Sequence, residues 1–70
     1  MNDSETLETV RRRMCINSFM AKDVENIYKD LPDLSRDEFY EIVRGEGDEG
    51  YDEDCSETMC NYYEYLQDIK

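Results

Sequence analysis

Apolar residues recur at intervals of three and four along most of this 70-residue chain, and that spacing limits the fold more than any other feature of the sequence. It is typical of helices that bury one face, and no stretch of useful length alternates as a half-buried strand does. The spacing predicts helices over about 19–30, over about 36–44 and from near Asp54 onward, with an earlier helix that breaks near Asn17 and Ser18. We therefore expect an all-α fold, a small bundle of three to four short helices.

The first helix is the least well defined of the four. Asp3 or Ser4 can cap it, because a side-chain oxygen there accepts hydrogen bonds from the free backbone N–H groups of the first turn. Residues 1–3 are expected to be frayed. The apolar positions that follow are Leu7, Val10 and Met14.

The third helix has the clearest local start signal. Ser35 followed three residues later by Glu38 forms a capping-box pattern. Leu34 and Phe39 occupy the two positions of a hydrophobic staple. Gly45 stands where glycine ends a helix in the left-handed conformation. The residues expected to be buried are Phe39, Ile42 and Val43.

Glycines and acids cluster before the last helix, and we interpret residues 45–53 as an acidic, glycine-rich loop. Asp54 and Glu57 repeat the capping spacing, so the last helix is predicted to begin near Asp54. Carboxylates there favour the positive end of the helix dipole. The predicted buried stripe of this helix is Cys55, Met59, Tyr62, Tyr63, Leu66 and Ile69.

The length of the chain allows one domain, residues 1–70, with a small core. No apolar run approaches the roughly 18–20 residues of a membrane-spanning helix. The three cysteines, Cys15, Cys55 and Cys60, are odd in number, and no pair has C-x-x-C spacing. Because no signal-like stretch opens the chain, we expect reduced thiols and a cytoplasmic location, the host cytoplasm if a phage encodes the protein.

Negative charge is concentrated toward the C-terminal end. Residues 46–57 hold seven carboxylates and no base, in a chain whose net charge is −11. Direct binding to nucleic acid or to anionic lipid needs positive charge, so both are unfavourable. Tyr40, Tyr51 and Tyr65 lie off the apolar stripes and are expected to be exposed, where tyrosine is typical of binding surfaces.

The residue types argue against catalysis and against a bound cofactor or metal. The chain has no histidine, the commonest general base, and exposed loop acids form no pocket that separates two pKa values. A low-ranking alternative is a degenerate helix–loop–helix calcium site that runs from Glu46 to Glu57. Tyr51 stands where such a loop needs glycine.

Arg11, Arg12 and Arg13 form the one basic cluster of the sequence. Consecutive residues fan around a helix and cannot all line one surface. We interpret them as a solvated face that pairs with the acidic loop of the same molecule. The alternative is a minor anchor for an acidic partner.

These features favour a non-enzymatic acidic protein that inhibits or modulates a partner by docking a negative, nucleic-acid-like surface on its basic, nucleic-acid-binding site. Such a DNA mimic is similar in size and composition, but in no aligned motif, to small acidic proteins that phages encode against host polymerases, nucleases and defence complexes. The residues expected to bind the partner are Glu46, Asp48, Glu49, Tyr51, Asp52, Glu53, Asp54, Glu57, Glu64, Tyr65 and Asp68.

Two other interpretations remain open. The protein can be a helical adapter that engages a partner through an apolar or tyrosine face, with its acidity serving solubility alone. It can also form a homodimer through the tyrosine-rich last helix. Under each of these interpretations, crowding of like charges predicts raised carboxylate pKa values. The fold is therefore expected to gain stability as pH falls from 7 toward 5.

Overall fold

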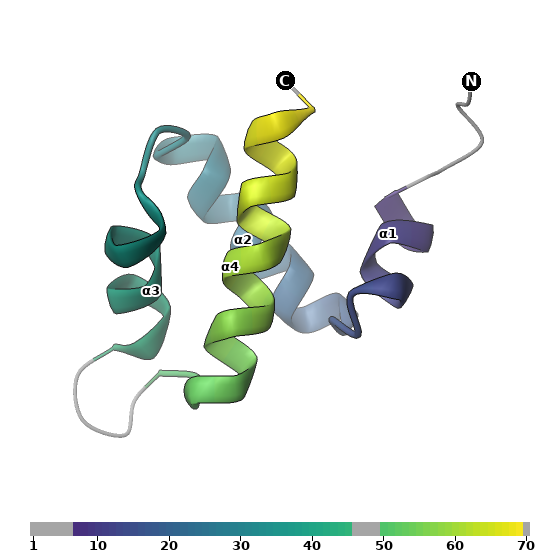
Figure 1. The fold of residues 1–70 in the computed structure, drawn as a ribbon, viewed down its shortest axis with the longest axis horizontal. Helices are drawn as coiled ribbons and strands as arrows, with labels where there is room; N and C mark the ends of the chain where they lie inside the picture. The colour runs from purple at the N-terminus through teal and green to yellow at the C-terminus, as the bar shows by residue number, and fades with distance from the viewer. Residues whose placement is uncertain (1–6, 46–49, 70) are drawn as a thin grey trace.

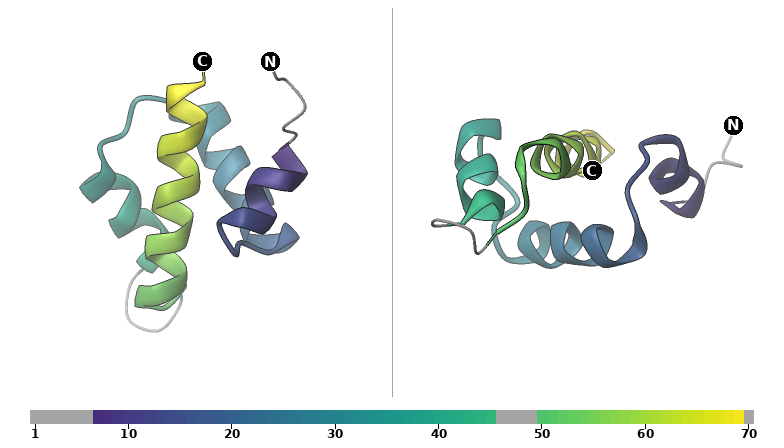
Figure 2. Two further views of the ribbon diagram at one scale, coloured as in Figure 1. Left: turned by 45° about the vertical axis from the view of Figure 1, so that its right-hand side comes forward. Right: turned by 90° about the horizontal axis from the view of Figure 1, so that it is seen from below.

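The computed structural model describes residues 7–45 and 50–69, and within these ranges it contains four helices and no strand, which confirms the predicted all-α bundle. Figure 1 shows α4 in front of α2, and the view from below in Figure 2 places α3 on one side of this pair and α1 on the other. The helices are α1 (Leu7–Arg13), α2 (Ser18–Asp30), α3 (Arg36–Arg44) and α4 (Glu53–Asp68).

The chain leaves α1 through a residue in the left-handed conformation. Cys15 has a φ of 60°, and the N–H groups of Cys15 and Ile16 bond carbonyls of α1 at 3.1 and 3.0 Å. This is a helix-ending motif in which glycine is usual. Asn17 then caps α2, because its side chain accepts an N–H of the first turn at 2.8 Å. The break thus ends at Asn17, and Ser18 is already helical.

The local signals at α3 are confirmed. The hydroxyl of Ser35 accepts the N–H of Glu38 at 3.2 Å, and the Glu38 carboxylate accepts the N–H of Ser35 at 2.9 Å. The helix ends at Arg44, as predicted. Gly45 has the predicted positive φ of 68°, but its ψ of −165° is not that of the left-handed helix. That backbone conformation is essentially restricted to glycine.

Tyr63 of α4 is the centre of the core. Its ring stacks on Phe39 at a centroid distance of 4.3 Å and meets Tyr28 edge-on at 5.8 Å. Its hydroxyl accepts the N–H of Leu34 at 3.0 Å and donates to the carbonyl of Leu31. This one side chain therefore joins three helices and provides hydrogen-bond partners for two backbone groups of the turn between α2 and α3. The buried apolar residues are Val10, Ile16, Met20, Ala21, Val24, Phe39, Val43, Met59, Cys60, Tyr62, Tyr63 and Leu66.

Two residues of the stripes predicted for the third and last helices are exposed. Ile42 is 45% exposed and Ile69 is 55% exposed. Ile69 follows the last residue of α4, where the chain has passed the core. On α3, Phe39 and Val43 lie about 40° apart around the helix, whereas Ile42 lies about 60° away on the other side of Phe39. The neighbouring helices therefore bury a narrower part of the surface of α3 than the spacing of its apolar residues predicts.

Candidate partner-binding surface

The acidic surface predicted from the sequence is present at the start of α4, but with a different cap. The carboxylate of Asp52 accepts the N–H of Cys55 at 2.9 Å, so Asp52 is the N-cap and the prediction that Asp54 caps the helix was wrong, although α4 begins at Glu53, near the predicted start. The physical reason is tertiary: the N–H of Tyr51 bonds the carbonyl of Val43 at 2.8 Å and sets where the chain enters α4. Four exposed residues, which we name the acidic end of α4, are Asp52, Glu53, Asp54 and Glu57.

The helix end stabilises the negative charge of these residues. The hydrogen bond from the backbone of Cys55 lowers the pKa of Asp52, and the charge of Arg44 adds a smaller effect in the same direction. Glu53 and Asp54 lie in the first turn, beside the positive end of the helix dipole. Asp52 is thus stabilised as a carboxylate at the start of α4, with Glu53 and Asp54 beside it in the first turn.

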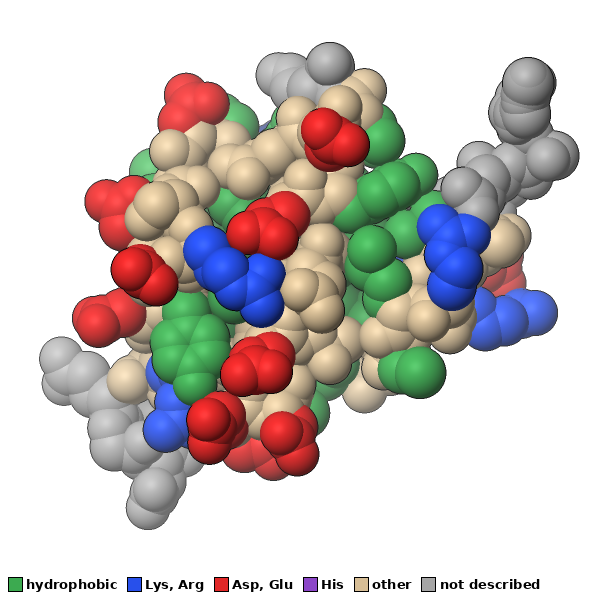
Figure 3. All heavy atoms as spheres, viewed as in Figure 1, with side chains coloured by type: hydrophobic (Ala, Val, Ile, Leu, Met, Phe, Trp, Pro, Cys, Tyr) green, Lys and Arg blue, Asp and Glu red, His purple; other side chains and the backbone are tan. Residues whose placement is uncertain are grey.

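Glu64 and Asp68 continue the exposed carboxylates along α4. With Asp54 and Glu57 they recur on one face of the helix over about 21 Å of its axis. Arg36 of α3 bonds Glu64 at 3.0 Å and partly neutralises this half. Acidic side chains accordingly gather over α3 and α4 in Figure 3, whereas basic ones are prominent over α1.

The tyrosines predicted to be exposed are instead half-buried. Tyr40, Tyr51 and Tyr65 all pack against the core. Burial and a hydrogen bond donated to Asp23 raise the pKa of Tyr51 to about 12. The ring of Tyr65 stacks on Tyr62 at 6.5 Å. A chain with two phenylalanines and no tryptophan uses tyrosine as its main core aromatic residue.

Three of the predicted binding residues, Glu46, Asp48 and Glu49, lie outside the described residues. The alignment with a calcium loop also begins there, so its first four positions lie outside the described residues. Within 7–45 and 50–69, no group of three or more potential metal ligands converges. Asp52, which that alignment places in the loop, serves instead as the cap of α4.

A half-buried ionic cluster joins α1, α2 and α4. Arg11 donates to Glu25, and its Nε donates to the hydroxyl of Tyr62 at 3.3 Å. That hydroxyl donates to Glu25 at 2.6 Å. Burial raises the pKa of Glu25, but the hydrogen bonds from Tyr62 and Arg11 outweigh burial, and the pKa is lowered. Arg12 pairs with Glu8 at 3.6 Å.

This cluster corrects the interpretation of the arginines as partners of the acidic loop, at least for Arg11 and Arg12. The cluster partners of Arg11 lie 14 and 51 positions away in the sequence. No local signal links residues so far apart, so sequence reasoning had no means of finding them.

The three thiols are free, and two of them are held in the neutral form. A hydrogen bond with Asp52 raises the pKa of Cys55, and burial raises the pKa of Cys60. A raised pKa lowers the fraction of reactive thiolate. Cys15 is exposed.

Comparison with protein-family models, with curated proteins and with solved structures found no match to this chain. In the part of the chain that the structure describes, no helix is long and apolar enough to cross a membrane. The function must therefore be inferred from the surfaces of the molecule itself.

Proposed function

We propose that the protein is a non-enzymatic acidic binding protein that docks the acidic end of α4 on a basic, nucleic-acid-binding surface of a protein partner, and so inhibits or modulates that partner. The observation that carries the proposal is the density of exposed carboxylate at this end. Glu53, Asp54 and Glu57 fall within about 100° around the helix axis, so they present their charge to one side.

The spacing of these charges is close to that of nucleic acid. From Asp52 to Glu57 the helix rises about 7.5 Å, which gives roughly one carboxylate per 2.5 Å. Duplex DNA carries one charge per about 1.7 Å of axis, and a single strand one per about 3.4 Å. Beyond Glu57 the carboxylates are sparser, and Arg36 offsets one of them. The mimicry is therefore confined to about one and a half turns of α4.

The distribution of charge over the described residues orients the molecule toward a basic partner. Residues 7–30 hold four acids and five bases, whereas residues 33–45 and 50–69 together hold ten acids and two bases. Both of those bases are occupied: Arg36 pairs with Glu64, and Arg44 donates to the carbonyl of Tyr51 at 3.3 Å. The electric field of so uneven a charge distribution accelerates association with a basic surface and turns the α3 and α4 side of the protein toward it.

Competition with nucleic acid tests the proposal. A partner recovered by affinity capture is loaded with a fluorescent duplex oligonucleotide, and we expect the protein to displace the duplex. The affinity should fall by at least about tenfold between about 50 and 200 mM salt. Failure to displace the duplex from any captured partner would reject the proposed mechanism.

A matched pair of variants separates the acidic end from net charge. Glu53→Gln with Glu57→Gln removes two carboxylates of the acidic end and leaves the Asp52 cap intact. Asp30→Asn with Asp33→Asn removes two exposed carboxylates elsewhere and changes the net charge equally. We expect only the first pair to weaken displacement, by about tenfold. Equal weakening by both pairs would show that net charge alone is responsible.

A further inference from the structure

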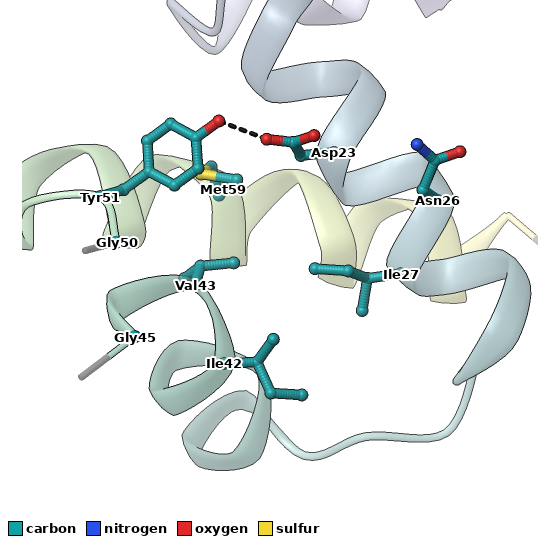
Figure 4. Close-up of a pocket in the computed structure, with 9 residues that line it drawn as sticks. All are labelled: Asp23, Asn26, Ile27, Ile42, Val43, Gly45, Gly50, Tyr51 and Met59. Atoms are coloured by element: carbon teal, nitrogen blue, oxygen red, sulfur yellow. Dashed lines mark hydrogen bonds between the residues drawn. The ribbon is translucent and has the colours of Figure 1, made fainter.

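Ile42 is an apolar residue that the helical spacing places with the buried face of α3, and that the fold leaves half-exposed. It is part of the lining of two hollows. The larger, of about 580 Å³, lies between α2 and α3, and Figure 4 shows Ile27 and Ile42 extending into it from the two helices. The smaller, of about 470 Å³, continues past Leu34. Because Ile42 lines both hollows, we treat them as one surface and name it the Ile42 groove.

The floor of the Ile42 groove is apolar and fixed. Val43 and Met59 at its base belong to the core and are buried. One end is closed by the hydrogen bond from the hydroxyl of Tyr51 to the carboxylate of Asp23, which ties the segment before α4 to α2 (Figure 4). A partner therefore meets a surface that is already formed and does not have to be ordered on binding.

The rim of the groove is acidic. No lysine or arginine is among the described residues that line either hollow. Glu38 is held in position by the capping box of α3. The carboxylates on the rim are Asp23, Asp37, Glu38 and Glu41.

We propose that the Ile42 groove binds an amphipathic helix of a protein partner, with an apolar face of leucine-like side chains flanked by lysine and arginine. Helices dock in apolar grooves between helices through anchors at positions i, i+3, i+4 and i+7. Basic flanks meet the acidic rim and complement its charge. An acidic helix, a nucleic acid or an anionic lipid surface would be repelled, and a second copy of this chain would add another net negative charge.

This site is distinct from the acidic end of α4, and its occupant is selected by apolar contact as well as by charge. A partner can therefore be recognised at two places, by charge at the start of α4 and by a helix between α2 and α3. The two proposals fail independently, because the variants that test them change different residues.

Synthetic peptides and an exposed-site variant test the groove. The probe is an 18-residue peptide with leucine at helical spacing and lysine or arginine on both sides; a scrambled peptide of the same composition is its control. Affinity is measured by fluorescence anisotropy, and the contact surface by amide chemical-shift changes in the labelled protein. We expect Ile42→Ser to weaken binding by about tenfold. Ile69→Ser, equally exposed but outside the groove, should change it less than twofold.

Two further measurements test the groove even if Ile42→Ser fails to fold. Glu41→Gln should weaken binding by about two- to threefold at low salt and leave the helical content unchanged. The shift changes should centre on Ile27 and Ile42. The proposal is overturned if the scrambled peptide binds as tightly as the amphipathic one, if Ile42→Ser binds like wild type, or if the shifts map to the acidic end of α4. Concentration-dependent dimerisation that blocks the peptide would identify a second copy as the occupant and would overturn it too.

Discussion

Replacing Tyr62 by phenylalanine should destabilise the fold, because it removes only the hydroxyl that joins α4 to Arg11 and Glu25. The hydroxyl donates to Glu25 at 2.6 Å and accepts from Arg11 at 3.3 Å, while the ring itself is fully buried. Phenylalanine keeps the ring and its packing. Any loss of stability therefore reports the hydrogen bonds of the cluster.

The expected loss follows from the exposure of the two charged partners. A hydrogen bond to a charged group contributes about 1.5–3 kcal/mol when its partners are well shielded. The side chains of Arg11 and Glu25 are 28% and 32% exposed, so water replaces part of the lost interaction. We expect a loss of about 1–2 kcal/mol in the free energy of unfolding. For a domain of this size the midpoint of thermal unfolding should fall by about 4–16 °C.

Tyr65→Phe is the matched control. Tyr65 lies one turn along the same helix, and within the described residues its hydroxyl has no hydrogen-bond partner. Removing that hydroxyl should change the stability by less than about 0.5 kcal/mol. Thermal and urea unfolding, followed by circular dichroism, measure both variants. If Tyr65→Phe is as harmful as Tyr62→Phe, the cluster does not contribute as described.

The pH dependence gives a second, independent check. The pKa of Glu25 in the folded state lies below its ordinary value of 4.5. A lowered pKa contributes stability that is present above the unfolded value and is lost as pH falls through the folded value. The difference between wild type and Tyr62→Phe should therefore be largest near neutral pH and shrink well below pH 4.5. A difference of equal size at pH 7 and pH 3 would refute this account.

Two other substitutions should raise stability. Cys15→Gly removes the strain of a non-glycine residue at a φ of 60°. After subtraction of the greater freedom that glycine gives the unfolded chain, we expect the free energy of unfolding to rise by about 0.5–1 kcal/mol. Urea unfolding of Cys15→Gly and Cys15→Ala measures this gain, and equal midpoints for the two variants would contradict it. Tyr28→Phe removes a buried hydroxyl that has no hydrogen-bond partner among the described residues. The free energy of unfolding should therefore rise by about 1 kcal/mol, and the midpoint of thermal unfolding by a few degrees. A decrease comparable to that of Tyr62→Phe would show that the hydroxyl makes a hydrogen bond.

The features that sequence reasoning predicted well are those set within four or five residues. The capping box of α3 and the end of that helix at Arg44 need only local spacing and side-chain chemistry. The start of α4 is different, because Asp52 and Asp54 can both cap. The hydrogen bond from Tyr51 to Val43 fixes the entry of the chain, and it needs glycine at position 50, where a Cβ would lie 2.1 Å from the carbonyl oxygen of Arg44. That close approach of two backbones cannot be read from the spacing of acids.

Crowded charge was also a poor guide to the pKa of particular carboxylates. The expectation was that mutual repulsion raises these values, yet the fold lowers the pKa of Glu25 and of Asp52. In both cases hydrogen bonds to the carboxylate provide the reason: from Tyr62 and Arg11 in the first, and from the N–H of Cys55 in the second. The stability that these two carboxylates contribute is therefore lost on acidification, below about pH 4.5 for Glu25 and below about pH 3.8 for Asp52.

The two candidate surfaces differ in how far the sequence could locate them, and the difference is physical. Exposed carboxylates such as Asp54 and Glu57 need only a correct helix to be placed on one side, because solvation keeps them on the surface whatever packs behind them. An apolar residue such as Ile42 is buried or exposed according to how far its neighbours extend. Here Tyr63 of α4 stacks on Phe39, Val43 is buried in the same core, and the next sector of α3, with Ile42, stays uncovered. The acidic end of α4 was therefore predictable, whereas the Ile42 groove exists only as a consequence of tertiary packing.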